Sequence, residues 1–433
     1  MRICMKSNSI EEIRKEVLKR VKPGEEETKR VTETAKNLVE RIEKAAGRPT
    51  MLVGSVAKGT FLSSDRDIDI FVIYDTDMTE SKLRKEVIVI GKKVFGRVEE
   101  RYAQHPYVHA RYEDFEIDLV PAFRFNGRIK SSVDRTPEHV RFVLAHMTEE
   151  IRDDILLLKQ FAKGIGIYGA EARVQGLSGY LCELFIIRFG SFEEFLKRAK
   201  SLEGVISFNA CQDRKKEGPL IFIDPVDPNR NVASSLSAEN LGLLRSAAEE
   251  FLREPILSFF FPNEPRLDER YPRERLFAVD LSDAIELRIE DIYFPQLRKT
   301  STSIARVLEE FGVEKSAIYC DGKRAMLFFL LKDKKLDETE KHKGPPIEMA
   351  ENARDFINRW GEERCYVQDG RIYATIKRSV VTPGEVLNAA MPEIGVGKGL
   401  RKEGIRILDD IPDDIAVRLF LIRSFSGKKP WEF

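Results

Sequence analysis

The chain has 433 residues, of which 42% are hydrophobic and 33% charged, and its 72 basic residues balance 72 acidic ones. This length exceeds one ordinary hydrophobic core, so we expect two to four domains. The five cysteines are scattered without a CxxC pair, which argues against a zinc site or a disulfide framework and favours the cytoplasm. No apolar run is long enough to cross a bilayer, and zero net charge does not exclude nucleic-acid binding, which depends on where charges cluster.

The first 135 residues are predicted to form a small α/β domain. Apolar side chains recur at three- and four-residue steps in a long helix, and short apolar runs predict strands on either side of a second helix. This alternation is typical of an α/β domain. The expected elements are a helix over 25–46, strands over 51–53 and 67–74, a helix over 81–94, and a strand or hairpin over 108–120.

The rest of the chain predicts a helical domain and then a mixed domain. Apolar spacing indicates helices around 155–161 and 181–189, and the proline-rich stretch 224–228 indicates a tight loop. We expect a highly charged loop over 332–343, before Gly344-Pro345-Pro346. The other expected elements are strands over 284–289, 325–331 and 372–376 and a helix over 297–311. The expected domains are 1–135, 136–262 and 263–433.

Three carboxylates carry the strongest chemical signal in the sequence. Asp67 and Asp69 lie two apart on a strand, so they point to the same face, and Asp118 lies on a later strand. Three like charges on one side of a sheet repel one another unless cations compensate them. Two Mg²⁺ ions would do so, and they would activate an attacking hydroxyl and clamp a leaving pyrophosphate.

Gly54 and Ser55 stand where a strand ends and a helix is expected to begin. Backbone N–H groups at that point, with the Ser55 hydroxyl and Lys58, would hold a triphosphate. The alternative is a solvated, Asp-rich strand edge beside a helix cap at Ser55. The order of Gly-Ser, Asp-x-Asp and a third Asp within one segment favours the first interpretation.

These residues and further stretches resemble the archaeal-type (class I) CCA-adding enzymes, which are tRNA nucleotidyltransferases of the DNA polymerase β superfamily. GSVAKGT at 54–60 followed by Asp67-Ile68-Asp69 is similar to the superfamily signature. More specific stretches run in family order between about residues 25 and 262, while the last third matches only in length and general pattern. These stretches are RYAQHPYVH (101–109), KSSVDRTPEH (130–139), GIYGAE (166–171), GLSGYLCEL (176–184) and DPVDPNRNVA (224–233).

The resemblance implies a multidomain α+β protein with a polymerase-β-like catalytic palm, a helical neck and an α/β C-terminal body and tail. It implies addition of C, C and A to the 3′ end of tRNA from CTP and ATP, without a template. Asp67, Asp69 and Asp118 would bind two Mg²⁺ ions, and Arg230 would contact the base edge and the tRNA end. The other nucleotide-binding residues implied are Gly54, Ser55, Lys58, His105, Thr136, His139, Lys159 and Tyr168.

Two positions depart from the common family pattern, which often has Glu at position 67 and Arg at position 58. Asp67 also reaches a metal, and Lys58 offers a point charge instead of a bidentate fork.

Each of the other residues also has a plain structural interpretation. Lys159 can be a solvent-facing helical lysine, Tyr168 can pack a turn, and His105 and His139 can be structural. Arg230 can pair with Asp224 or Asp227 to hold its own loop.

The tRNA would be held through its phosphates by the C-terminal third and by clustered basic residues. One cluster contains Arg124, Arg128, Lys130 and Arg135, and another contains Lys398, Arg401, Lys402 and Arg406. The second begins in a glycine-rich turn that is not a P-loop; it is either a phosphate-contacting turn or an exposed helix start.

Two other functions stay open. A poly(A) or oligonucleotide synthetase would share the signature but not 105–109 and 224–233, and a catalytically silent RNA-binding protein would not need all three carboxylates. The sequence leaves a homodimer open.

Overall fold

The computed structural model describes residues 9–75, 78–102, 106–124, 132–208, 218–286 and 289–433. The chain divides into two compact units, which are described separately. Unit 1 contains Met1–Glu264 and Lys428–Phe433, and unit 2 contains Pro265–Gly427. Among the described residues, no helix combines the length and the apolar character needed to span a membrane.

Unit 1 begins with a five-stranded sheet in the order β1-β2-β5-β4-β3. The β2 and β5 strands run parallel, and the other neighbouring pairs run antiparallel. The expected strands in this region are confirmed, including the hairpin. The strands are β1 (Thr50–Val53), β2 (Asp67–Tyr74), β3 (Glu99–Tyr102), β4 (Pro106–Tyr112) and β5 (Phe115–Phe123).

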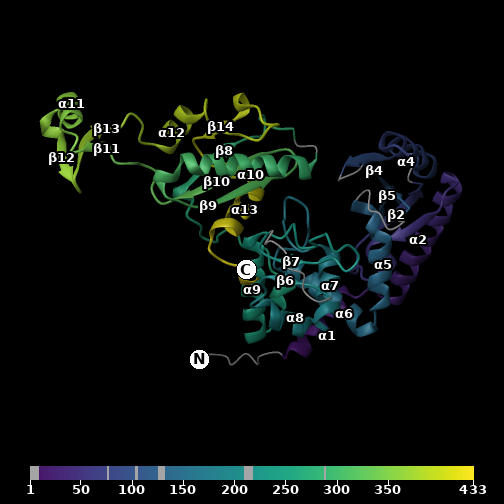
Figure 1. The fold of residues 1–433 in the computed structure, drawn as a ribbon. Coiled ribbons are helices and arrows are strands. Elements are labelled where there is room, and N and C mark those ends of the chain that lie inside the picture. Colours follow the sequence, from purple (N-terminus) through teal and green to yellow (C-terminus); the bar gives the residue numbers. More distant parts are fainter. Residues whose placement is uncertain (1–8, 76–77, 103–105, 125–131, 209–217, 287–288) are drawn as a thin grey trace. The chain divides into compact units, whose positions relative to one another are not determined.

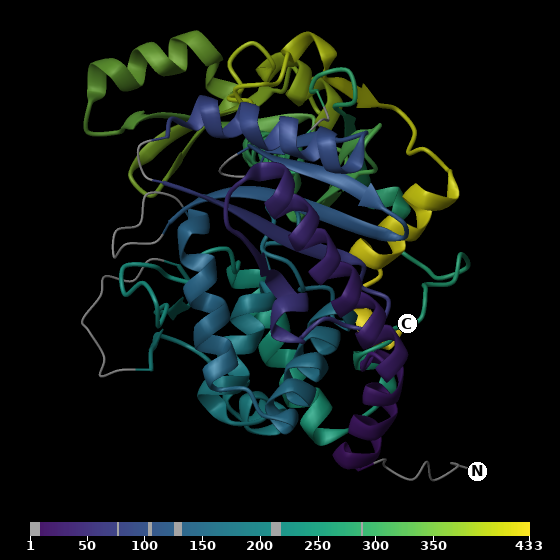
Figure 2. The same ribbon diagram turned by 90° about the vertical axis from the view of Figure 1, so that its right-hand side faces the viewer.

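Two long helices, α2 (Glu25–Ala46) and α4 (Glu80–Phe95), cover one face of this sheet (Figures 1 and 2). Both helices were expected, the first from its apolar spacing. Because side chains alternate along a strand, every second residue of β2, such as Ile68 and Ile70, is buried under these helices. The remaining side chains of β2, β5 and β4 therefore point to the opposite face.

That opposite face is covered in part by α5 (Thr136–Ala145), which follows the short 3₁₀ turn η1 (Ser132–Arg135). Val140 of α5 packs in a buried cluster with Val53, Phe71 and Ala122. The short helix α3 (Gly54–Lys58) continues directly from β1. Near the N-terminal ends of β2 and β5, the side chains on this face are polar.

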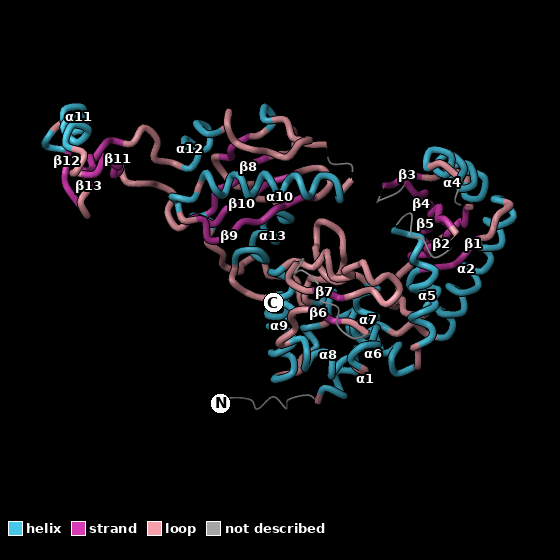
Figure 3. The backbone as a smooth tube through the Cα atoms, viewed as in Figure 1, coloured by secondary structure: helices cyan, strands magenta, loops and turns pink. Residues whose placement is uncertain are grey.

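The second part of unit 1 is helical (Figure 3). A ring cluster fills its core: Phe161 contacts Phe192, Phe251, Phe259 and Phe260, with ring centroids 5.5–5.9 Å apart. The elements are α1 (Ile10–Val21), α6 (Glu149–Gly164), α7 (Gly179–Phe189), α8 (Phe192–Ala199), α9 (Ala238–Arg253), η2 (Leu257–Phe259), η7 (Pro430–Glu432) and the paired strands β6 (Val205–Ile206) and β7 (Ile221–Phe222).

Unit 2 contains a four-stranded antiparallel sheet in the order β14-β8-β10-β9. Apolar side chains of α13 pack on one face of it. Its elements are β8 (Leu276–Asp280), β9 (Val313–Cys320), β10 (Ala325–Leu331), β14 (Arg406–Leu408), α10 (Glu290–Val307), α12 (Pro383–Ala390), α13 (Ile415–Phe425), and the 3₁₀ turns η3 (Arg273–Arg275), η4 (Glu309–Phe311) and η6 (Lys402–Gly404).

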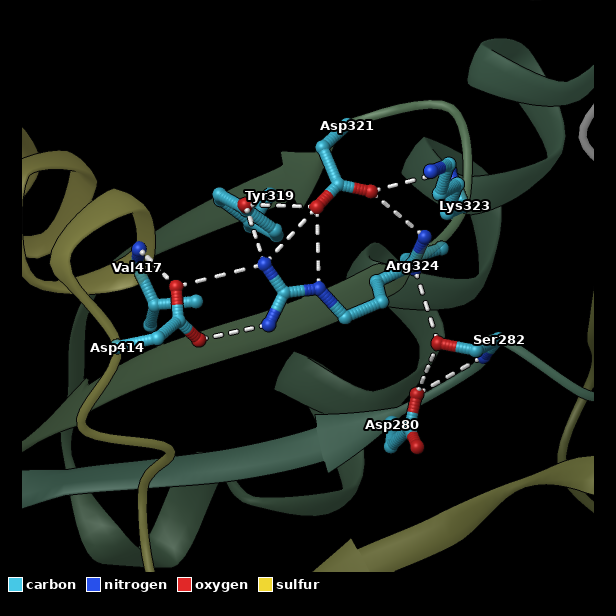
Figure 4. A network of polar contacts seen from close by, with 9 residues as sticks. Asp280, Ser282, Tyr319, Asp321, Lys323, Arg324, Asp414 and Val417 are labelled. Carbon is cyan, nitrogen blue, oxygen red and sulfur yellow. Dashed lines mark hydrogen bonds and ion pairs between the residues drawn. The ribbon is translucent and has the colours of Figure 1, made fainter.

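A polar network fixes the β9–β10 turn to α13 (Figure 4). The Arg324 guanidinium donates to Asp321 at 3.0 Å, to Tyr319 at 2.9 Å and to Asp414 at 2.6 Å. Asp414 also caps α13 by accepting from the backbone N–H of Val417 at 3.1 Å. All of these groups have partners, so we interpret the network as structural.

A separate three-stranded sheet in unit 2 has the order β11-β13-β12 and is covered on one face by α11. His342 of β11 stacks on Phe356 of α11, with ring centroids 5.7 Å apart and planes inclined by 4°. The elements are β11 (Thr339–Pro346), α11 (Ala350–Trp360), η5 (Glu362–Arg364), β12 (Cys365–Gln368) and β13 (Arg371–Lys377).

Two predictions for unit 2 were wrong. In the segment expected as a strand over 284–289, the described residues 284–286 and 289 form no strand, and the strand of that region is β8, which precedes it. The segment 339–343, expected as part of a charged loop, lies in β11. β11 is an edge strand, and the charged side chains of Glu340, Lys341 and Lys343 are compatible with an edge because they discourage pairing with another chain.

We predict that Trp431→Ala will destabilise unit 1 by about 3–5 kcal/mol, as expected for a buried aromatic residue. Trp431 is 4% exposed, stacks on Phe259 with centroids 4.8 Å apart, and donates to Glu250 at 3.0 Å. Thermal and denaturant unfolding measure the change. Val89→Ala, at a side chain that is 64% exposed, is the control. Equal small effects of both changes would contradict the prediction.

Candidate functional site

The three predicted carboxylates lie together on the sheet face that α2 and α4 do not cover. In the parallel pairing of β2 and β5, Asp69 stands opposite Asp118 and Asp67 opposite Glu116. Neighbouring strands are about 4.8 Å apart, and paired residues point to the same side. The arrangement that the sequence predicted for these three side chains is therefore present.

The electrostatics of this face are those of crowded negative charge. Burial raises the pKa of Asp69 to about 6, and the charges of Asp118 and Asp67 add to the rise. Burial also raises the pKa of Asp67, with contributions from Asp65 and Asp118. Both carboxyls therefore lose stability in the charged form, and a cation at this face would reverse that cost.

His109 is a further residue of this face that sequence reasoning did not single out. It stands opposite Asp118 on β4, and its Nδ1 lies 2.7 Å from Asp118 Oδ1. Its Nε2 lies 2.7 Å from Glu116 Oε2, and Arg111 donates to the other oxygen of Glu116 at 2.7 Å. Burial acts to raise the pKa of Glu116, but these two partners outweigh it and lower the pKa. The two-residue alternation of β4 is the signal that places His109 here.

The residues fit a divalent cation that shares its coordination with a substrate. Among the described residues, no group of three or more His, Cys, Asp or Glu side chains is arranged to hold a metal ion by itself. Mg²⁺ commonly takes one or two carboxylates and completes its octahedron with water and substrate phosphates. The carboxylate oxygens of Asp67, Asp69 and Asp118, crowded on one face, match that chemistry.

Gly54 is fixed by the close approach of Asp69. Its φ is +71°, and a Cβ at this position would lie 1.9 Å from Asp69 Oδ2. Only glycine allows both the left-handed backbone and the carboxylate beside it. Ser55 follows in the first turn of α3 and is half-buried. The glycine therefore sets the distance between α3 and the sheet face that carries Asp67, Asp69 and Asp118, which we call the acidic face.

Lys58 and Lys159 lie in one buried cluster around Glu183. Lys58 Nζ is 2.6 Å from Glu183 Oε2, and Lys159 Nζ is 3.3 Å from Oε1. Thr60 Oγ1 donates to the same Oε1 at 2.7 Å. Lys159 is 2% exposed, so the interpretation of a solvent-facing lysine was wrong. Sequence reasoning missed Glu183, although an acid inside the apolar run 181–186 is a signal for a buried cation.

Tyr168 is brought next to Lys159. A Cβ built on Gly179 would lie 3.0 Å from the Tyr168 hydroxyl and 3.7 Å from Lys159 Nζ. Burial raises the pKa of Tyr168, so its hydroxyl keeps its proton and remains a donor. Lys163 Nζ lies 5.4 Å from the centre of the Tyr168 ring.

Arg230 and His139 meet at a second buried carboxylate, Asp224. Its Oδ2 lies 2.9 Å from both Arg230 Nη1 and His139 Nε2. Burial acts to raise the pKa of Asp224, but His139, the Val226 N–H and Arg230 outweigh it and hold the pKa at about 2. Burial lowers the pKa of His139. Arg230 thus holds its own loop, as one interpretation expected, and one-third of its side chain stays exposed.

Of the other residues predicted to contact the nucleotide or the tRNA, some lie within the described residues and some do not. Thr136 is the first residue of α5, half-buried, and lies one helical turn before His139. His105 lies outside the described residues, as do Arg128 and Lys130 of the first basic cluster. Arg135 of that cluster pairs with Asp227 at 2.7 Å.

The second basic cluster is tied largely into its own unit. Lys402 donates to the backbone carbonyls of Met391 and Pro392, and Arg401 donates to that of Asp283. The glycine turn packs against α10, because a Cβ on Gly397 would lie 2.5 Å from Gln296 Cβ. Lys398 is exposed. Residues 402–404 form a 3₁₀ turn, so the expected helix start is not an α-helix.

Three family models match successive parts of the chain. The nucleotidyltransferase domain matches residues 24–146, the second domain of tRNA nucleotidyltransferase matches 153–261, and the C-terminal domain of the CCA-adding enzyme matches 277–408. One solved structure, that of the Cid1 poly(U) polymerase bound to MgATP, is 14% identical. It covers 57% of this chain and 97% of that chain at a TM-score of 0.47.

Full-length relatives give the decisive comparison. The CCA-adding enzyme of Thermoplasma volcanium is 34% identical over 89% of this chain and 90% of its own length. Those of Methanosarcina acetivorans and Methanocaldococcus jannaschii are 33% and 32% identical, over 92% and 93% of this chain and 94% and 96% of their own lengths. With the acidic face in place, these matches leave one conclusion: the chain belongs to the family of archaeal CCA-adding enzymes.

Proposed function

We propose that this chain adds C, C and A to the 3′ end of tRNA from CTP and ATP, with two Mg²⁺ ions held at Asp67, Asp69 and Asp118. The observation that carries the proposal is the pairing of Asp69 with Asp118 on neighbouring parallel strands. In each transfer the 3′-hydroxyl oxygen of the tRNA end forms a bond to the α-phosphorus of CTP or ATP. The bond between that phosphorus and the leaving pyrophosphate breaks. Bound divalent ions supply activation of the hydroxyl and neutralisation of the phosphates.

The chain's own residues hold the reacting groups in place. Gly54 allows α3 to approach Asp69 closely, and Ser55 follows it in the first turn of that helix. Lys58, Lys159 and Tyr168 would then meet the triphosphate. Two ammonium groups against one Glu183 carboxylate leave an excess of one positive charge when both lysines are protonated, which suits a polyanion.

Base selection is assigned to the loop around Arg230. Asp224 accepts from Arg230 and restricts its orientation, while the remaining N–H groups of the guanidinium can donate to acceptors on cytosine or adenine. We assign His139, His105 and Thr136 to the surroundings of the incoming nucleotide. Tyr180 stacks on His139 with centroids 4.1 Å apart, which keeps the imidazole in position.

We propose that tRNA contacts the open face of the β11–β13–β12 sheet, which α11 leaves uncovered. Strand pairing places Lys341 opposite Thr375, and Tyr366 and Lys343 each opposite Tyr373. The two tyrosines stack with centroids 5.9 Å apart, and Lys341 Nζ lies 3.9 Å from the Tyr373 ring centre. The paired positions of this face carry no acidic side chain. The face comprises Thr339, Lys341, Lys343, Tyr366, Gln368, Arg371, Tyr373, Thr375 and Lys377.

The division into a catalytic part (1–135), a helical part (136–262) and a C-terminal part (263–433) stays a proposal. Contacts place residues 428–433 with unit 1. A cytoplasmic location and a homodimer also stay predictions.

The activity is tested with tRNA that lacks its last three nucleotides, labelled CTP or ATP, and Mg²⁺. We expect addition to stop after CCA. Asp118→Ala should lower kcat about a thousandfold or more, because a metal-binding carboxylate is lost. A long A tail would instead indicate a poly(A)-type transferase, and near-normal turnover by the variant would remove Asp118 from the mechanism.

Gly54→Ala is expected to lower activity at least about a hundredfold, because its Cβ would displace Asp69 from a position on which the chemistry depends. Gly47→Ala is a matched control: Gly47 has a φ of +60° but has nothing within 4 Å of the added Cβ. Both changes should cost similar backbone strain, and only Gly54→Ala should reduce turnover. Equal activities in the two variants would refute this role.

For the tRNA surface, we predict that Lys341→Glu with Lys343→Glu weakens tRNA binding about tenfold or more and flattens its salt dependence. The KM for CTP should stay unchanged. Filter binding at several salt concentrations measures the effect, with the exposed Lys335→Glu as control. Lys398→Glu measures, for comparison, how much the second basic cluster contributes to tRNA affinity. Unchanged tRNA affinity in the double variant, or a larger loss in Lys398→Glu, would contradict the assignment.

A further inference from the structure

The cluster around Glu183 contains a buried acid to which neither the family resemblance nor the proposed mechanism assigns a part. Glu183 lies on α7, its side chain is 1% exposed, and its two oxygens face different partners. Oε1 accepts from Thr60 at 2.7 Å and lies 3.3 Å from Lys159 Nζ. Oε2 lies 2.6 Å from Lys58 Nζ. The carboxylate thus joins three separate segments of unit 1.

A buried carboxylate is costly unless its partners compensate it. Burial acts to raise the pKa of Glu183, but Lys58 and Lys159 outweigh burial and lower it, so the acid is charged at neutral pH. The compensation is mutual, because each lysine is also almost fully buried. Without the carboxylate, two ammonium groups would share a dry site and repel each other.

The geometry gives the two oxygens different tasks. Lys159 is fixed, since its Nζ also donates to the Thr60 carbonyl at 2.8 Å and to the Thr60 hydroxyl at 3.1 Å. The Lys58 ammonium has Glu183 as its charged partner and the Tyr180 ring, 5.8 Å away, beside it. Lys58 ends α3, the helix that begins at Gly54, so its position is linked directly to the acidic face.

We propose that Glu183 is a positioning residue for the triphosphate: it holds the Lys58 and Lys159 side chains in place at the edge of the acidic face before the nucleotide arrives. This inference rests on the proposed function, in which both lysines meet the triphosphate. Glu183 itself touches no reacting atom, so its effect belongs to nucleotide binding more than to chemistry.

A pH dependence follows from the surroundings of Lys159. The groups that face it are Glu183 and Cys182 of α7, Lys58 of α3, Thr60 and Tyr168. Burial lowers the pKa of Lys159, and the charge of Glu183 opposes that lowering. Removing the charge lowers this pKa further. Nucleotide binding by such a variant should therefore be lost at a lower pH than in the unmodified protein.

The test is Glu183→Gln in the full chain, which keeps the shape and removes the charge. We expect the KM for CTP and ATP to rise about tenfold or more, the factor that corresponds to about 1.4 kcal/mol. The rise should begin at lower pH than in the unmodified enzyme, with kcat changed much less. Glu250→Gln removes another ion-paired acid of unit 1 and should leave both KM values unchanged.

The outcomes separate the competing explanations. A lower KM in Glu183→Gln would mean that Glu183 competes with the triphosphate for Lys58, and an unchanged KM with a reduced melting temperature would mean a merely structural acid; either result overturns the proposal. Should Glu183→Gln not fold, Glu183→Asp retains the charge on a shorter side chain. Its KM for CTP and ATP should rise less than the tenfold expected for loss of the charge. A KM that does not rise at any pH would overturn the proposal. If the unmodified chain adds no CCA, the proposed function fails instead.

Discussion

The β2–β5 pair places like charges side by side, and much of unit 1 is arranged around that constraint. A parallel register brings Asp69 next to Asp118 and Asp67 next to Glu116. Burial raises the pKa values of Asp67 and Asp69, and the neighbouring negative charges add to the rise. The fold tolerates this electrostatic repulsion because the other face of the same strands is buried under α2 and α4, and that apolar burial stabilises the sheet. Apolar burial on one face thus offsets the repulsion on the other, which bound cations and a nucleotide would neutralise.

Two further buried carboxylates lie away from Asp67, Asp69 and Asp118, and each is paired with cationic side chains. Glu183 compensates the two lysines assigned to the triphosphate, and Asp224 compensates Arg230 and contacts His139. Tyr180 lies between them: its ring is beside Lys58 and stacks on His139, and its hydroxyl lies 3.3 Å from Asp224. The nucleotide would therefore meet cations whose positions are already set, which reduces the entropy lost on binding.

The sequence predicted the elements that carry a clear period and the residues that carry a motif. The helix over 25–46 and the strands over 67–74 and 325–331 were found with the same boundaries, because a continuous apolar stripe or run defines each of them. Asp67, Asp69 and Asp118 could be brought together in advance because strand alternation fixes the direction of their side chains. Glu183 was missed because its role depends on contacts with Lys58 and Lys159, which lie on other helices. His109 was missed because its role depends on the register of the β4–β5 hairpin, which sets it opposite Asp118. The charged β11 was missed because an edge strand has no apolar period to reveal it.

We propose that the acidic face becomes complete only with divalent cations and a nucleotide. The most direct measurement is titration of Mn²⁺, as a spectroscopic substitute for Mg²⁺, into the full chain with and without a non-reactive CTP analogue. We expect weak Mn²⁺ binding to the chain alone, two tightly bound ions per chain with the analogue, and loss of tight binding in Asp69→Asn. Tight binding that neither needs the nucleotide nor changes in Asp69→Asn would show that this face is not the nucleotide-dependent metal site.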